Sequence, residues 1–142
     1  MHTDVVTYLE VLAILLLTGF VSVAMGLLVS ALASSQDQAT SFIPLVLIPQ
    51  LLFAGSIVAY QSMSAPVQAL STFVYSRWSF AGVGSAVGMN TRLAADPVAR
   101  GKNRFGPDFF TLSTSTTCLI LLAFMAVFFA AVALLVRRRA PR

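Results

Sequence analysis

The sequence predicts an all-α integral membrane protein with three transmembrane helices and one further helix that is re-entrant or lies at the membrane interface. Of its 142 residues, 58% are hydrophobic and 10% are charged, whereas about a quarter of a soluble domain is charged. Residues 11–33 form an unbroken apolar run, which at 1.5 Å per residue can cross a hydrocarbon core of roughly 30 Å. A second apolar span follows a short polar interruption, and a third ends at an arginine cluster.

These features predict a single membrane domain over residues 1–142, with spans at residues 5–33, 39–60 and 115–136. The polar interruption supplies capping side chains for the second span, and Asp37 is placed to accept from a backbone N–H one turn into that helix. So short a connection predicts that the first two helices are antiparallel and adjacent.

Residues 61–114 lie between the second and third spans and are predicted to form a helix followed by an aqueous loop. Apolar residues recur at helical spacing over residues 66–80, and Tyr75 and Trp78 suit a membrane interface. The glycines at 82, 84 and 88 predict a flexible or closely packed turn region. Residues 89–110 are hydrophilic and contain turn signals, which predict the loop. Four arginines in the tail at residues 137–142 are typical of a stop-transfer sequence.

Small residues mark one face of the first span. Ser22, Gly26 and Ser30 are spaced four apart and follow Thr18 in the same register, so they share a helix face. Small residues let another helix backbone approach closely. We therefore expect this face to pack against protein.

Gln50 is a polar residue in the middle of the second span, directly after Pro49. Two interpretations are open. Gln50 forms a hydrogen bond that holds helices together, which is the common role of an amide at membrane depth and the one we favour. Alternatively, it lines a translocation route, since intramembrane polarity also marks functional sites.

Composition argues against several other classes of protein. The net charge of +4 arises from basic residues that flank the apolar spans, so membrane lipids explain them better than nucleic acid does. The chain has one cysteine and one histidine, and we expect no metal site and no cofactor in it. No GxxxxGK[ST] loop occurs in the sequence, so we expect no ATPase activity and no catalytic residues.

Three stretches carry a resemblance to a known family: LVSALASSQDQA at residues 28–39, LIPQLLFAGSIV at 47–58 and APVQALSTFVYSRWSF at 65–80. They resemble the C-terminal half of ABC exporter permeases of the type-2 class, and most of all the white and pleiotropic-drug G subfamily and its bacterial relatives. The resemblance implies half of a six-helix permease domain, whether as a truncated gene product, a split subunit or an excerpt of a longer chain.

The resemblance also implies roles for individual residues. Phe53 and Gly55 belong to a Phe-small-Gly motif at the end of the second span, and the next two positions, here Ser56 and Ile57, close the central cavity outward. With Gln50 they form the candidate gate and pathway. Ser56 departs from the apolar pattern of the family. Arg77 and Trp78 match a pair on the extracellular helix, although Ser76 replaces the usual preceding proline.

Charge counts on the two sides of the membrane are nearly equal, and the resemblance decides the orientation. It implies that residues 61–114 lie outside and that the tail at 137–142 is cytoplasmic, in the plasma or inner membrane of the cell.

The partners implied are an ABC ATPase domain or subunit that carries ATP and magnesium, the N-terminal permease half, a second permease copy and membrane lipids. The alternative is a small non-transporting membrane protein that scaffolds or stabilises a larger complex through its small-residue faces. A neighbouring gene for an ATPase or for the missing half would separate the two hypotheses.

Overall fold

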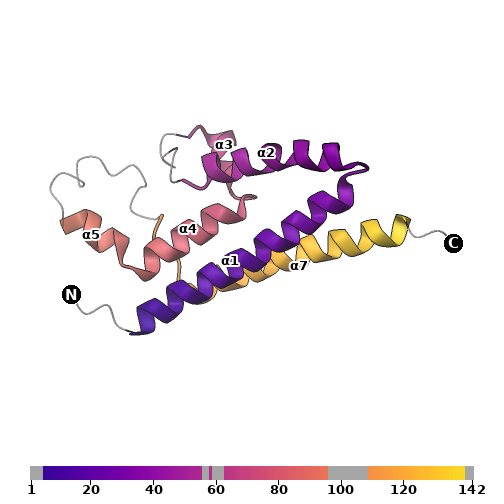
Figure 1. The fold of residues 1–142 in the computed structure, drawn as a ribbon. Helices are drawn as coiled ribbons and strands as arrows, with labels where there is room; N and C mark the ends of the chain where they lie inside the picture. Colours follow the sequence, from indigo (N-terminus) through magenta and orange to yellow (C-terminus); the bar gives the residue numbers. More distant parts are fainter. Residues whose placement is uncertain (1–4, 56–57, 59–62, 96–108, 140–142) are drawn as a thin grey trace.

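The computed structural model describes residues 5–55, 58, 63–95 and 109–139, and helices are the only regular secondary structure in these residues. The predicted all-α class is therefore confirmed for this part of the chain. Its six helices, with the labels of Figure 1, are α1 (Val5–Leu32), α2 (Gln36–Phe53), α3 (Ala65–Ser71), α4 (Tyr75–Ala86), α5 (Met89–Ala95) and α7 (Thr114–Arg139).

Helices α1 and α7 are the two described helices that are long and apolar enough to cross a membrane. They lie close to the predicted first and third spans, and they run side by side in the same direction (Figure 1). Ile14 and Val21 of α1 and Leu121 of α7 are fully buried in one hydrophobic cluster. Most other large side chains of these helices are exposed, as expected of helices that face lipid.

Helix α2 differs from the predicted second span at both ends. Its N-cap is Ser35, whose hydroxyl accepts from the backbone N–H of Gln38, so the cap predicted at Asp37 was wrong. It ends at Phe53 instead of continuing to residue 60, because Gly55 adopts a φ of 94° that does not continue a right-handed helix. Its 18 residues extend roughly 27 Å, and its first turn is polar. Spanning by α2 therefore stays a prediction.

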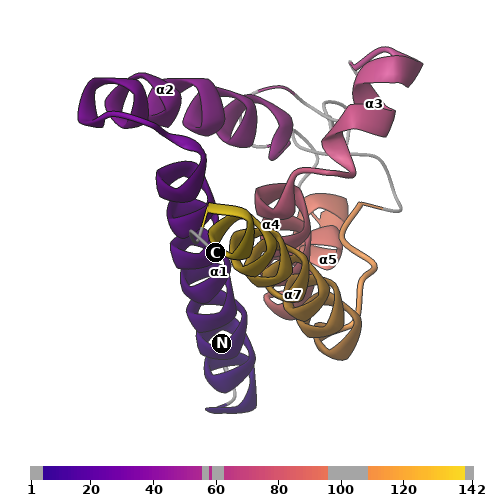
Figure 2. The ribbon, with the colours of Figure 1, turned by 90° about the vertical axis from the view of Figure 1, so that its right-hand side faces the viewer.

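The antiparallel packing of α1 and α2 is looser than predicted. Both views show α2 turning back after α1 but diverging from it (Figures 1 and 2). The reason is the first turn of α4, which contacts both helices: Tyr75 bonds to Ser22 of α1 and Ser76 bonds to Gln50 of α2. The short connection fixes where the helices meet, whereas α4 fixes how far they separate.

Residues 66–80 do not form the single helix predicted. They belong to α3 and α4, which are separated by a break at residues 72–74. Local side chains satisfy the last carbonyls of α3: Ser71 donates to Gln68 O (2.7 Å) and Thr72 donates to Ala69 O (2.6 Å). Such bonds compete with continued helix. The helical spacing of apolar residues predicted the helical structure of both α3 and α4, but it does not reveal the break between them.

Helix α4 runs antiparallel to both α1 and α7. Tyr75 lies beside Ser22 and Ser79 lies beside Thr18, so the chain order on α4 is opposite to that on α1. Against α7, Tyr75 makes edge-to-face contacts with Phe124 and Phe128, with ring centroids 6.5 and 6.3 Å away. These contacts place α4 beside both apolar helices, α1 and α7. A re-entrant or interfacial position of α4 in the membrane stays a prediction.

The glycines of α4 are packing positions. A Cβ atom at Gly82 would lie 2.3 Å from Thr117 Cγ2 of α7, and one at Gly84 would lie 2.3 Å from the Phe110 ring. The closely packed alternative is thus confirmed for both, although they lie inside a helix and not in a turn. Gly88, with a φ of 66°, lies in the turn after α4.

The predicted aqueous loop at residues 89–110 was wrong at both of its described ends. Its beginning forms α5, which follows α4 after one turn. At its other end, Phe109 and Phe110 are buried against Phe80 and Ala81 of α4. The hydrophilic composition of residues 89–110 did not predict these contacts. Two aromatic side chains, Phe109 and Phe110, are enough to anchor the end of the segment on α4. Residues 96–108 lie outside the described residues.

We predict that Gly82→Ala lowers the free energy of unfolding by about 1–3 kcal/mol, because the added methyl group overlaps Thr117. Gly26→Ala is the matched control: a Cβ at Gly26 meets nothing within 4 Å, so alanine should be neutral or slightly stabilising there. Unfolding by sodium dodecyl sulfate in mixed micelles can be followed through Trp78 fluorescence. Equal losses in both variants would contradict close packing of α4 on α7.

Candidate functional site

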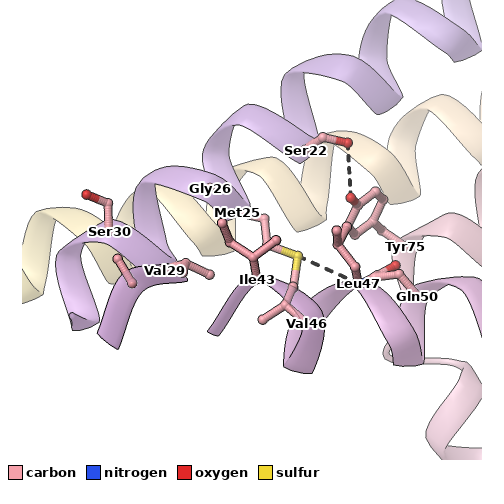
Figure 3. Close-up of a pocket in the computed structure, with 11 residues that line it drawn as sticks. Ser22, Met25, Gly26, Val29, Ser30, Ile43, Val46, Leu47, Gln50 and Tyr75 are labelled. Carbon is pink, nitrogen blue, oxygen red and sulfur yellow. Dashed lines mark hydrogen bonds between the residues drawn. The ribbon is translucent and has the colours of Figure 1, made fainter. Parts of the chain in front are cut away.

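A pocket of about 390 Å³ lies between α1 and α2, within the size range of small-molecule sites. Figure 3 shows its walls: side chains of the second half of α1 face those of α2, and Tyr75 of α4 closes one end. Among the described residues, the lining is largely apolar and contains no Asp, Glu, Lys, Arg or His. Its residues are Ser22, Met25, Gly26, Val29, Ser30, Ala39, Ile43, Val46, Leu47, Gln50 and Tyr75.

Gln50 is the most constrained polar residue of this pocket, with 9% of its surface exposed. Its Oε1 accepts from the backbone N–H of Ser76 (3.3 Å), while its backbone carbonyl accepts from Ser76 Oγ (2.6 Å). Its Nε2 donates to Met25 Sδ at 3.7 Å. Gln50 therefore joins α2 to both α4 and α1, as the packing interpretation predicts, and it also lines the pocket. In this geometry Gln50 can both hold helices together and line a cavity, so the two interpretations left open by the sequence are compatible.

Two further side-chain bonds join α4 to α1, and their donors can be assigned. Thr18 Oγ1 donates to Ile14 O and Ser22 Oγ donates to Thr18 O. Each hydroxyl has one proton, so Ser79 donates to Thr18 (2.6 Å) and Tyr75 donates to Ser22 (3.0 Å). With the two bonds between Ser76 and Gln50, they form the α4 ladder, four hydrogen bonds that fix this helix against α1 and α2.

The predicted packing face on α1 divides into two parts. Ser22 contacts α4 through the Tyr75 hydroxyl. Gly26 and Ser30 instead border the pocket and are exposed, and a Cβ at Gly26 meets nothing within 4 Å. Within the described part of the chain, no backbone approaches Gly26 closely. Packing at Gly26 and Ser30 stays a prediction about a partner outside this chain.

The predicted gate residues lie apart from the pocket. Phe53 ends α2, and Gly55 is buried with its Cα against the ring of Phe109, where an added Cβ would approach Cζ to 3.0 Å. Neither residue lines the pocket. Ser56 and Ile57 lie outside the described residues, so their predicted role as an outward closure stays a prediction. The structure brings Gln50, Ser22, Gly26 and Ser30 together, but not Gly55.

Arg77 and Trp78 lie in the first turn of α4 and hold the end of α3. Arg77 donates to Ser71 Oγ (3.1 Å), and Trp78 Nε1 donates to Thr72 O (2.8 Å). The Arg77 guanidinium carbon also lies 5.1 Å from the centre of the Trp78 ring, a cation–π distance. These contacts close the corner between the two helices. The pair therefore has a structural role in positioning the segment that carries Tyr75 and Ser76.

Sequence reasoning missed Tyr75 and Met25 as pocket residues and Thr117 as a partner of α4. Thr117 is fully buried, and its Oγ1 has no hydrogen-bond partner among the described residues. A helical projection of residues 75–86 would have shown the signal, because Tyr75, Ser79 and Gly82 share one face. Met25 gave no signal, since methionine in an apolar span is ordinary.

Residues 2–87 match the family model described as ABC-2 type transporter. The match includes α1, α2, α3 and α4, and therefore every helix that lines the pocket. It does not extend over α5 and α7. No solved structure matches the chain.

We predict a coupling free energy of about 0.6 kcal/mol between Thr18→Val and Ser79→Ala in a double-mutant cycle, the average value for such bonds in membranes. The two side chains bond directly across α1 and α4. Free energies of unfolding in mixed micelles supply the cycle. Thr40→Val with Ser79→Ala is the control pair, because Thr40 bonds only within α2. A coupling no larger than in the control would show that the Thr18–Ser79 bond does not hold α4.

Proposed function

Because the chain belongs to the ABC-2 type transporter family, we propose that it is the C-terminal portion of the permease of an ATP-driven exporter. Membership makes it a membrane permease component of an ABC transporter. Export as the direction of transport, the C-terminal position and a location in the plasma or inner membrane are our proposals. The observation that supports a role in transport is that the matched region contains all three helices that line the pocket, α1, α2 and α4.

Permease domains of this family generally work with ABC ATPases and form dimers. We assign ATP hydrolysis, with its magnesium, to such a partner, because this chain has no phosphate-binding loop. The N-terminal permease half and a second permease copy complete the translocation pathway. A Cβ added at Gly26 would meet nothing within 4 Å, and Ser30 is exposed, so both supply small-residue positions for such partners.

The packing supports a division into two bodies for alternating access. Helices α1, α4 and α7 share one core, whereas α2 packs only loosely, and about equally, against α1 and α4. ATP binding by the partner would favour one position of α2 relative to that core, and the pocket would change width with it. A transition of this kind needs a difference in interaction free energy between two states, and the bonds that join Gln50 to α1 and α4 are the contacts that a movement of α2 would change.

We predict that the tagged chain, purified from its native membrane in mild detergent, brings with it an ABC ATPase and vanadate-sensitive ATP hydrolysis. The direct evidence is identification of the ATPase by mass spectrometry, and a tagged unrelated membrane protein of similar size is the control. A stable complex that contains no ATPase would instead favour the scaffold alternative, in which the small-residue positions hold a non-transporting assembly together.

We predict that the connection between α1 and α2 faces the cytoplasm and that α5 faces the outside. Cysteines at Ser34 and Ala95 test this in a Cys118→Ala background, since both positions are exposed. An impermeant maleimide should label Ala95→Cys on intact cells and Ser34→Cys only after permeabilisation, which is the control for reactivity. Labelling of Ser34→Cys alone on intact cells would reverse the orientation.

A further inference from the structure

The side-chain amide of Gln50 has hydrogen-bonding capacity that the described residues do not use well. Its Nε2 carries two N–H groups, and its acceptor there is the thioether sulfur of Met25 at 3.7 Å, which is a weak one. The amide is nine-tenths buried and lines the pocket. An oxygen atom in the pocket would be a better acceptor than sulfur.

Tyr75 offers the complementary group at the same end of the pocket. Its proton goes to Ser22, because the Ser22 proton already goes to Thr18 O. The phenolic oxygen therefore keeps its capacity to accept. Figure 3 shows Tyr75 and Gln50 next to each other at this end, with the apolar walls of α1 and α2 extending away from them. A hydroxyl group can both accept from an amide and donate to a phenol.

We propose that the pocket between α1 and α2 binds a neutral, largely apolar molecule that carries a hydroxyl group, with Gln50 Nε2 as donor and Tyr75 Oη as acceptor. The absence of charged side chains from the lining disfavours ions. The inference rests on the proposed function in one respect only, namely that the bound molecule is cargo. Binding itself requires neither an ATPase nor transport.

The test uses the full chain in phosphatidylcholine vesicles with two photoactivatable analogues, a diazirine derivative of dodecanol and the corresponding hydrocarbon without the hydroxyl. Labelled residues are mapped by mass spectrometry while the mole fraction of each analogue is raised. We expect the alcohol to label Met25, Val29, Ile43 and Val46. We expect its labelling to reach half-saturation at a mole fraction at least roughly five- to tenfold lower than that of the hydrocarbon, because each of the two buried hydrogen bonds contributes about that factor.

Two kinds of variant assign the effect to the pocket. Gln50→Met keeps the length and removes the donor, so it should reduce the difference between the two analogues and leave only the contribution of Tyr75. Gly26→Leu should fill the pocket and reduce labelling by both. Gly19→Leu is the matched control for Gly26→Leu. Gly19 is the other glycine of α1; it is also exposed, and an added Cβ would meet nothing within 4 Å, but it does not line the pocket. It should leave both labelling curves unchanged.

Each outcome decides the proposal. Equal half-saturation of the two analogues in the unmodified chain would overturn the hydroxyl preference, even if Gln50→Met failed to fold. Labelling that Gly26→Leu and Gly19→Leu affect equally would overturn the site. Selective labelling in a chain that copurifies with no ATPase would support the site and remove only its identification with transport. An ATPase complex without selective labelling would support the transporter and remove only the site.

Discussion

Polar groups that are buried between helices must be hydrogen-bonded within the protein, and the position of α4 depends on that constraint. This helix carries hydroxyl groups into a region bordered by two apolar helices, and their protons must find acceptors in the protein. Ser79 finds Thr18, Tyr75 finds Ser22, and Ser76 finds the backbone carbonyl of Gln50. These acceptors lie at different positions along α1 and α2. Together they fix both the rotation of α4 about its axis and its position along these two helices.

Close packing supports the same arrangement from the other side. Gly82 lets the backbone of α4 approach Thr117 of α7, and Gly84 accommodates Phe110. The aromatic contacts of Tyr75 with Phe124 and Phe128 complete a core shared by α1, α4 and α7. Attraction between helices in lipid comes from such packing and from hydrogen bonds, because burial of apolar surface adds little there.

The pocket follows from this packing. Because the first turn of α4 lies between α1 and the later part of α2, the two helices separate and leave space along their facing surfaces. The residue that joins α2 to α4, Gln50, is consequently also the residue that offers a donor to that space. A molecule that binds there would act directly on the contact between α2 and the rest of the fold. This shared residue gives a physical route by which occupancy and helix position can influence each other.

The sequence by itself determined the helical class, the positions of α1 and α7 and the family, because length, apolarity and short motifs are local properties of the chain. It also marked Gln50 as a polar position with a role in packing or transport, and Ser22 as part of a packing face. It did not reveal the break between α3 and α4, the buried anchor at Phe109 and Phe110, or the early end of α2 at Phe53. Only the tertiary structure decided which residues meet: Gln50 and Ser76 are 26 residues apart, and Thr18 and Ser79 are 61 apart. Contacts at such separations depend on how whole helices pack, and no local pattern specifies them.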